Sequence, residues 1–194
     1  MVELPDVAIE GKEMDIDFLK ECLLVEVIGS EEKRFTWARA IRHAWRQPKR
    51  RFLFWWRIAS YLYHKEGRFA KRLAAKINRN LMRKYGAEVE LGAFIDTGLY
   101  IGHYNGVAIS QHAHIGKNFT IRQNTTIGVN NNSLPFTIGD NVNVGAHSCI
   151  LSKGIVIGDN VTIGAFSFIN KDIPSNCVCY TRRENVVIEK GIEE

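Results

Sequence analysis

His103 is the residue whose side chain and surroundings best suit proton-transfer chemistry. It lies in a glycine-rich segment, Gly98-Leu-Tyr-Ile-Gly-His-Tyr-Asn-Gly106. Imidazole titrates near neutral pH, so it can take a proton from an attacking hydroxyl group and return a proton to a leaving group. Backbone N–H groups in glycine-rich turns can stabilise the oxyanion that forms in such a reaction. The alternative interpretation of His103 is an exposed corner residue without a catalytic role.

The other histidines and the cysteines do not form a recognisable metal site. His112 and His114 are two residues apart and share a strand face, but no third well-placed ligand is evident. Cys177 and Cys179 are too close for an ordinary disulfide and lack a partner pair for zinc. We therefore expect no bound metal, and reduced cysteines in a cytoplasmic protein.

A six-residue unit repeats around His103, between Ile95 and Ile169. It consists of an aliphatic residue, often a glycine after it, and then small or polar residues, as in Ile115-Gly-Lys-Asn-Phe-Thr and Ile157-Gly-Asp-Asn-Val-Thr. A period of six is neither helical nor a simple strand alternation. It indicates a hexapeptide solenoid, in which three units close one triangular coil of a parallel β-helix. Gly and Asn suit its tight corners because a positive φ costs them little.

Two insertions interrupt this repeat. Val107-Ala-Ile109 adds two residues just after His103, and residues 129–137 are expected to form an extruded loop. Loops that leave a rigid solenoid are expected places for substrate contacts.

Helical spacing of apolar residues predicts four helices before the repeat begins. Gly29 is expected to end the first helix, Pro48 to begin the third and Gly86 to end the fourth. The chain thus divides into a helical, basic and aromatic domain (1–86), a β-helix domain (87–180) and a C-terminal tail (181–194). The apolar residues at helical spacing are Ile16, Leu19, Leu23 and Val27; Phe35, Ala38, Ile41 and Trp45; Phe52, Trp55, Ala59 and Leu62; and Phe69, Leu73, Ile77 and Leu81.

Positive charge is concentrated in the helical region. Residues 33–84 contain 17 of the 26 Lys and Arg residues and one acidic residue, Glu66. Within this stretch, residues 45–57 mix cationic and aromatic side chains, which is typical of helices that lie at an anionic membrane surface. The alternative is that the aromatic side chains form a helical core or cover the first coil of the solenoid. Nucleic-acid binding is not expected, because no recognised motif accompanies the charge.

No membrane-spanning or secretory segment is expected. No apolar run approaches the roughly 20 residues that a spanning helix needs. The N-terminal residues lack a charged start followed by an apolar stretch. The expected location is therefore cytoplasmic, with peripheral contact to the inner membrane face as an option.

The segment 98–109 resembles the serine acetyltransferase family of left-handed β-helix acyltransferases, which has a histidine after a glycine and mostly apolar residues. The blocks 115–128 and 138–146 also resemble that family. The resemblance implies α-helices followed by a left-handed parallel β-helix, and a homotrimer with active sites between neighbouring solenoids. It further implies direct acetyl transfer from acetyl-CoA in a ternary complex, with His103 as the general base.

The resemblance also suggests roles for further residues. Glu88 corresponds to the carboxylate that orients the histidine, with Asp96 as the alternative. Tyr104 and Asn105 are candidates for contacts to the acceptor. Ordinary turn geometry, or a solvated basic end of the solenoid, is the alternative explanation for most of these candidates. The candidates for binding the coenzyme are Gly128, Gly145, Ala146, Gly164, Ala165, Lys171 and Arg182, with Arg183 beside it.

Two departures from the family concern the acceptor and the coenzyme. Leu134 stands where members that act on serine have a histidine, and the basic residue before it is missing. The usual closing Gly-Asn-Pro-Ala-Arg is also absent. We therefore expect a sugar hydroxyl as acceptor, on a polysaccharide precursor that a lipid could carry, in capsule, exopolysaccharide or O-antigen biosynthesis. The alternatives are serine O-acetylation and a non-catalytic trimeric scaffold.

Overall fold

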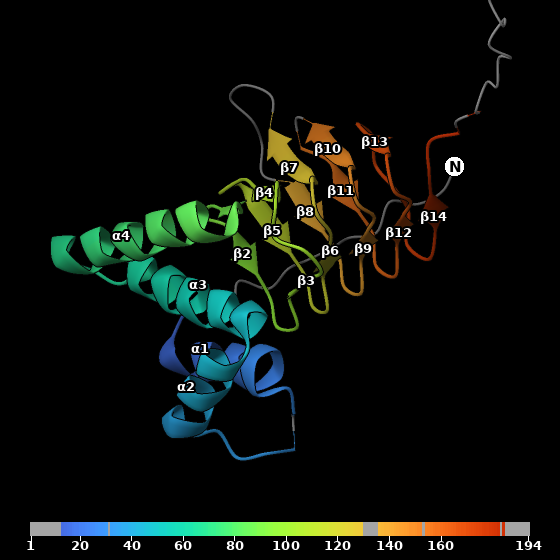
Figure 1. The fold of residues 1–194 in the computed structure, drawn as a ribbon. Coiled ribbons are helices and arrows are strands. Elements are labelled where there is room, and N and C mark those ends of the chain that lie inside the picture. The colour runs from blue at the N-terminus through green and yellow to red at the C-terminus, as the bar shows by residue number, and fades with distance from the viewer. Residues whose placement is uncertain (1–12, 31, 130–135, 153, 183, 185–194) are drawn as a thin grey trace, which may run out of the picture.

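A computed structural model describes residues 13–30, 32–129, 136–152, 154–182 and 184. Helices fill the first part of the chain, here called the helical half (13–86), and short parallel strands form a prism, here called the solenoid (87–180) (Figure 1). This confirms the predicted fold class of helices followed by a parallel β-helix. The helices are α1 (Ile16–Leu23), the π-helical turn η1 (Leu24–Ile28), α2 (Trp37–Arg46), α3 (Pro48–His64) and α4 (Arg68–Tyr85).

The helix boundaries follow local signals in the sequence. The Asp15 carboxylate accepts hydrogen bonds from two backbone N–H groups in the first turn of α1, at 2.7 and 3.0 Å, and so caps that helix. Pro48 is the first residue of α3, where its missing N–H costs nothing. Gly29 (φ 75°) ends η1 and Gly86 (φ 64°) ends α4 in the left-handed conformation that glycine adopts easily. These three predicted boundaries are confirmed.

Two of the predicted apolar faces are not buried as expected. In α2 the buried residues are Ala40 and Ala44, whereas the side chain of Trp45 is 77% exposed. The small alanine side chains allow α2 to approach α3 closely, and the large side chains turn outward. In α4, Leu81 is buried but Phe69, at the other end of the same ladder, is 80% exposed.

The solenoid consists of three parallel sheets, one for each side of the prism. Sheet A contains β1 (Glu88–Val89), β4 (Ala108–Ile109), β7 (Thr126–Val129), β10 (Cys149–Ser152) and β13 (Phe168–Ile169). Sheet B contains β2 (Phe94–Ile95), β5 (Ala113–Ile115), β8 (Phe136–Ile138) and β11 (Val156–Ile157). Sheet C contains β3 (Tyr100–Ile101), β6 (Thr120–Ile121), β9 (Asn143–Val144), β12 (Thr162–Ile163) and β14 (Val178–Cys179).

The repeating aliphatic residues stack inside the prism. Ile95, Ile115, Ile138 and Ile157 follow one another in sheet B, and each is completely buried. Removing four such side chains from water in one column is a main source of the solenoid's stability, at about 25 cal/mol for each Å² of apolar surface.

The strand register locates the insertions. Ala108 pairs with Thr126, 18 residues further on, which is the length of three hexapeptides. Glu88 pairs with Ala108, and Tyr100 with Thr120, both at a distance of 20 residues. The two extra residues therefore lie in the turn between β3 and β4 that holds His103, whereas Ala108 and Ile109, expected as part of the insertion, are regular residues of β4. Of the loop expected over residues 129–137, Val129 belongs to β7 and Phe136 and Thr137 belong to β8, while residues 130–135 lie outside the described residues.

One corner of the prism is built from asparagines. Asn118, Asn141, Asn160 and Asn176 all have φ between 55° and 60°. The side-chain amides of the first three each donate to the side-chain oxygen of the asparagine in the next coil, at 3.0 to 3.1 Å. Asparagine tolerates the left-handed conformation and supplies both a donor and an acceptor, so it suits a stacked corner.

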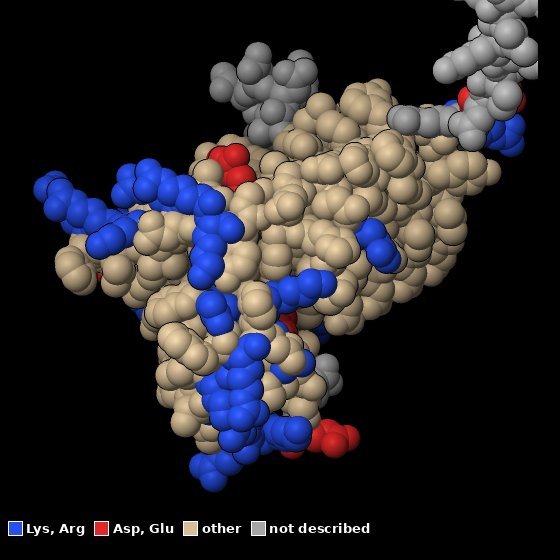
Figure 2. Space-filling view, in the orientation of Figure 1, with Lys and Arg blue, Asp and Glu red and all other residues tan. Residues whose placement is uncertain are grey.

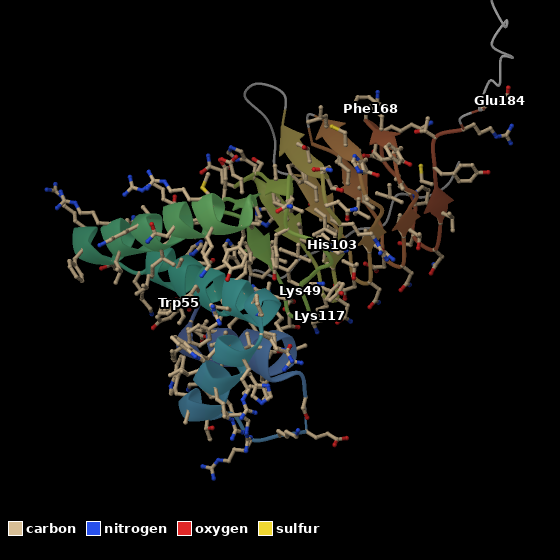
Figure 3. The ribbon with its side chains drawn as sticks, in the orientation of Figure 1. Lys49, Trp55, His103, Lys117, Phe168 and Glu184 are labelled. Atoms are coloured by element: carbon tan, nitrogen blue, oxygen red, sulfur yellow. The ribbon has the colours of Figure 1, made fainter. Side chains whose placement is uncertain are left out.

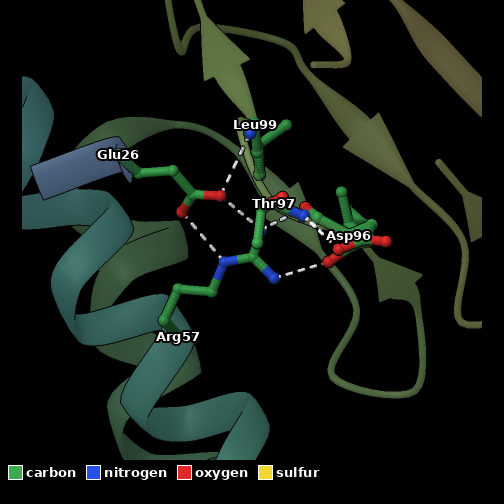
Figure 4. Close-up of polar contacts among 6 residues, drawn as sticks. Glu26, Arg57, Asp96, Thr97 and Leu99 are labelled. Atoms are coloured by element: carbon green, nitrogen blue, oxygen red, sulfur yellow. Dashed lines mark hydrogen bonds and ion pairs between the residues drawn. The ribbon is translucent and has the colours of Figure 1, made fainter. Parts of the chain in front are cut away.

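A buried ion pair joins the helical half to the first coil. Arg57 of α3 and Glu26 of η1 have side chains that are 1% and 0% exposed, and the guanidinium donates to the carboxylate through its Nε and Nη2 atoms. Arg57 also donates to the carbonyl oxygens of Ile95 and Asp96 at 2.6 and 2.8 Å, while Glu26 accepts from the Leu99 N–H at 3.0 Å (Figure 4). The loop between β2 and β3 is therefore fixed by two helical side chains.

Candidate active site around His103

His103 lies on the corner between sheets C and A, in the first coil of the solenoid, and its side chain is exposed. The backbone on both sides of it is anchored. The Gly102 N–H donates to the Ile121 carbonyl in the next coil at 2.9 Å, and the Gly106 N–H donates to the Gly86 carbonyl at the end of α4 at 2.8 Å. The histidine therefore projects from a turn that the helical half and the second coil hold in place.

The first turn of α3 forms a two-way contact with this turn. The Lys49 ammonium group donates a hydrogen bond to the carbonyl oxygen of Gly102 at 2.6 Å. The Tyr104 hydroxyl donates to the carbonyl oxygen of Lys49, also at 2.6 Å. Residues on both sides of His103 are thus bound to one residue of α3, and Figure 3 shows Lys49 and His103 together where the helices meet the solenoid.

Tyr104 itself lies inside the protein. Its ring packs against Phe52 with ring centroids 4.5 Å apart and against Tyr85 at 5.4 Å. Burial raises the pKa of the Tyr104 phenol well above its ordinary value, so it stays a hydrogen-bond donor. Asn105, the second residue suggested for acceptor contacts, is exposed on the turn. Within a single protomer, the buried Tyr104 side chain is placed to fix the His103 turn rather than to contact a ligand.

The two acidic candidates lie in different places. Glu88 is an exposed residue of β1, and with Gly106 and Val107 of the His103 turn it lines a cavity of about 290 Å³. Asp96 follows β2 on sheet B, and its carboxylate accepts a hydrogen bond from the Thr97 N–H at 2.7 Å. Among the described residues, neither carboxylate hydrogen-bonds to the imidazole of His103. The orienting role of Glu88 remains a prediction.

Four of the candidates for coenzyme binding stand in the column of corners above His103. Gly102 hydrogen-bonds to the second coil, and Gly145 and Gly164 occupy the same corner in the third and fourth coils, with Ala146 and Ala165 next to them. The column runs from the histidine along one edge of the prism. In the second coil Arg122 takes this position, so the row of small residues is confined to the third and fourth coils and ends near Tyr180.

The close stacking of the coils explains why two of these positions are glycine. A β-carbon on Gly145 would lie 2.4 Å from the backbone nitrogen of Ala165, and one on Gly164 would lie 2.9 Å from the Tyr180 β-carbon. No real side chain fits at such distances. Coenzyme binding by these residues is thus not required to explain the glycines, and it remains a prediction.

The other coenzyme candidates lie elsewhere on the solenoid. Gly128 belongs to β7 and Lys171 follows β13, so both lie towards the opposite end of the sheet A strands from His103. Lys171 and Arg182 are exposed. Arg183 lies outside the described residues.

The histidines that follow β4 have ordinary structural surroundings. His114 is part of β5, where its ring stacks on Phe94 with centroids 6.3 Å apart, and His112 is exposed. Within the described ranges, no cluster of three or more His, Cys, Asp or Glu residues is arranged to hold a metal ion.

Two cations near His103 were not identified from the sequence. Lys49 is exposed overall and, apart from the Gly102 carbonyl, its ammonium group lies 5.9 Å from the Tyr100 ring centroid. Arg122 is exposed one coil above, and its Cγ atom lies 3.6 Å from where a β-carbon on Gly102 would stand. Lys49 is 53 residues from Gly102 in the chain, so no local sequence pattern reveals this contact.

Comparison with known proteins identifies the relatives of this fold. A family model described as the hexapeptide repeat of succinyl-transferase matches residues 135–171. A serine acetyltransferase from Synechococcus elongatus is 33% identical over 139 residues, which cover 70% of this chain and 55% of that protein. The chain spans about half the length of the curated relatives it matches.

Solved structures agree with this assignment. Serine acetyltransferase isoform 3 from Entamoeba histolytica, in complex with cysteine, superposes with a TM-score of 0.69 at 25% identity, covering 90% of this chain and 60% of that one. The soybean serine acetyltransferase complexed with serine has the same fold, with a TM-score of 0.70 at 22% identity, covering 88% and 70% of the two chains.

These relatives overturn one expectation from the sequence. The sugar acceptor, with its place in polysaccharide biosynthesis, was inferred mainly from Leu134, and it is wrong: the relatives found are serine acetyltransferases. The departures at Leu134, at the position before it and at the closing segment are local, whereas the similarity to a serine acetyltransferase extends over 139 residues. The chain carries the hexapeptide repeat of the left-handed β-helix acyltransferases and is similar to them, with serine acetyltransferases as its homologues.

Proposed function

We propose that this protein is an O-acetyltransferase that transfers the acetyl group of acetyl-CoA to the hydroxyl group of serine. The observation that carries this proposal is the exposed His103, held on its corner by Lys49 and Tyr104, in a chain 33% identical to a serine acetyltransferase over 139 residues. In the proposed arrangement three copies assemble in the cytoplasm, and each His103 faces a crevice between neighbouring solenoids.

The proposed reaction needs one base and no acyl-enzyme. A ring nitrogen of His103 takes the proton of the serine hydroxyl while the oxygen attacks the thioester carbonyl carbon. The tetrahedral intermediate collapses by breaking the carbon–sulfur bond, and the leaving thiolate takes the proton from the imidazolium. The products are O-acetylserine and free coenzyme A. Fixing the histidine backbone from two sides reduces the entropy lost on reaching the reactive geometry.

Acetyl-CoA is the donor substrate in this proposal. In this proposal the coenzyme passes along Gly145, Ala146, Gly164 and Ala165, whose small size brings it close to the backbone of the third and fourth coils. A pantetheine arm carries amide groups that can bond to such a backbone, with its thioester end at the histidine. Exposed Arg182, two residues after Tyr180 at the end of this row, is available for the phosphates of the coenzyme, whereas Lys171 lies on another corner of the prism.

The acceptor carboxylate needs a cation, and the loop does not supply one. Ser133, Leu134 and Pro135 are uncharged. Lys49 and Arg122 flank the Gly102–His103 corner, are exposed, and form no ion pair with any described carboxylate. An ammonium group has three donors, and Lys49 uses one of them on Gly102. In this proposal these two cations hold the carboxylate of serine beside the base.

Thiol release tests the proposed function. Purified protein with acetyl-CoA is expected to release free coenzyme A in the presence of serine and not in its absence. His103→Ala is expected to lower kcat by at least about 100-fold because the general base is lost. His112→Ala, which removes another exposed solenoid histidine, serves as the matched control and is expected to keep full activity.

Two results would contradict the proposal. One is an unmodified protein that binds no acetyl-CoA and releases no thiol with serine, as expected of a non-catalytic scaffold. The other is a folded His103→Ala variant that transfers acetyl groups at the parental rate.

A further inference from the structure

A row of exposed apolar side chains runs along α2. Trp37, Ile41 and Trp45 follow one another at four-residue spacing, with side chains that are 42%, 52% and 77% exposed. We call these three residues the α2 stripe. The core-facing side of the helix is provided by Ala40 and Ala44 instead, and the stripe stays outside the core, with Trp37 packing edge-on against Phe35 at 5.1 Å between ring centroids. Large indole and aliphatic groups left in water on one helix face need another explanation.

Arginines border this stripe. At 100° per residue, Arg42 and Arg46 fall on the side of α2 next to Trp45 and away from the buried alanines, and both are exposed. Arg51 of α3 lies with its guanidinium carbon 5.4 Å from the Trp45 ring centroid and donates to the carbonyl oxygens of Ala44 and Trp45. The stripe is therefore an apolar strip with cations fixed along its edge, which is the pattern of a helix that lies in a membrane interface.

The same character extends over the rest of the helical half. On α4, Phe69 is 80% exposed and Leu73 is 38% exposed, one turn apart. Figure 2 shows Lys and Arg side chains spread over the helices on the face in view, while that face of the solenoid shows few. Residues 33–84 carry 17 basic residues against one acidic residue, so any extended partner of this surface must be anionic.

We propose that the helical half binds anionic lipid headgroups, with the α2 stripe inserted at the boundary between headgroups and acyl chains. Nucleic acid is also anionic, but bases stack on aromatic rings and give no role to exposed Ile41 and Leu73. No helix among the described residues is long and apolar enough to span a bilayer, so the contact is peripheral. Arginines next to the stripe reach the headgroups while Trp37 and Trp45 occupy the interface.

Vesicle flotation with the full chain tests this proposal. The probes are vesicles of phosphatidylcholine alone and of phosphatidylcholine with about one third phosphatidylglycerol. The protein is expected to float with the anionic vesicles and to remain unbound with the neutral ones. Raising the salt from about 0.1 to about 0.5 M is expected to release much of it, because the Debye length shortens.

Matched variants distinguish binding through the α2 stripe from nonspecific hydrophobic adsorption and from nonspecific charge attraction. Trp45→Ala is expected to weaken binding to anionic vesicles at least fivefold, whereas Phe168→Ala, which removes an exposed aromatic ring from the solenoid, leaves binding unchanged. Arg42→Glu is expected to weaken binding about 30-fold, since each charge near the surface contributes about 1 kcal/mol and the substitution changes the charge by two. Lys171→Glu makes the same charge change on the solenoid and is expected to have little effect.

Three outcomes would overturn the proposal. If equal amounts of protein float with neutral and with anionic vesicles, binding does not depend on the anionic headgroups. Equal loss of binding in Trp45→Ala and Phe168→Ala removes the role of the stripe. Self-association in the absence of lipid that Trp45→Ala abolishes would assign the stripe to a contact between copies of this chain.

Discussion

The Lys49 ammonium group donates a 2.6 Å hydrogen bond to the carbonyl oxygen of Gly102, the residue immediately before His103. The contact joins the first turn of α3 to the first coil of the solenoid. The backbone carbonyl of the same lysine accepts from Tyr104, the residue immediately after His103. A single residue of the helical half therefore fixes both sides of the proposed base, which ties the function of the solenoid to the correct docking of its helices.

Replacing Lys49 tests its role in positioning and in acceptor recognition. Lys49→Met is expected to raise KM for serine about tenfold, the effect of losing one charge-assisted hydrogen bond, with KM for acetyl-CoA unchanged. Lys49→Arg keeps the charge and is expected to restore most of the affinity for serine. The measurement is steady-state thiol release with each substrate varied in turn.

A second acceptor distinguishes carboxylate binding from a purely structural role. Serinamide lacks the negative charge, so the unmodified protein is expected to prefer serine and Lys49→Met to lose that preference. If Lys49→Met lowers the rates with serine and serinamide equally, Lys49 acts only on the backbone of the turn. If the unmodified protein acetylates neither acceptor, the proposed function itself has failed.

The buried pair Arg57–Glu26 is expected to be required for stability. Arg57→Met leaves a carboxylate without its partner in a site where both side chains are almost completely buried, which typically costs about 3–5 kcal/mol in the free energy of unfolding. The double variant Arg57→Met/Glu26→Leu is expected to lose less than the sum of the two single variants, because no unpaired charge remains. Urea denaturation at a fixed protein concentration measures all four proteins, and strictly additive losses would argue against a coupled pair.

The architecture of the solenoid is predicted largely by the six-residue spacing of its aliphatic residues. Residues such as Ile115 and Ile121 recur every six positions and are completely buried, because each coil places the same position of the repeat inside the prism. The two-residue insertion after His103 was likewise visible in the sequence and appears in the strand register.

The sequence predicts less well which faces of the helices are buried and which residues surround His103. Helical spacing places Ile41 and Trp45 on one side of α2 but does not say which side faces the core, and two alanines take that place. The Lys49–Gly102 contact depends on how α3 docks on the first coil, and no repeat or local motif encodes that geometry. The predicted sugar acceptor is wrong because it rests on a few local departures, Leu134 foremost, whereas the similarity to a serine acetyltransferase extends over 139 residues.

Cys22 is expected to resist thiol reagents in the folded protein. Burial raises the pKa of its thiol from 9.0 to about 12, so at pH 8 almost none of it is the reactive thiolate. Cys177 and Cys179 are partly exposed and are expected to react first. Native alkylation at pH 8 followed by mass spectrometry checks the order, with denatured protein as the control for full labelling. Labelling of Cys22 as fast as Cys179 would mean that α1 and its surroundings open readily.

Gly145 allows the packing explanation to be separated from a coenzyme role. In Gly145→Ala the new β-carbon would stand 2.4 Å from the backbone nitrogen of Ala165, so the third and fourth coils must move apart. Overpacking of this kind typically costs about 1–3 kcal/mol in stability.

Gly102→Ala is the control for stability, because the nearest atom to its β-carbon would be Cγ of Arg122 at 3.6 Å, an ordinary contact with a flexible side chain. Thermal unfolding is expected to show a lower Tm for Gly145→Ala and little change for Gly102→Ala. If Gly145→Ala instead keeps its stability and raises KM for acetyl-CoA, the glycine is there for the coenzyme and not for the stacking of the coils.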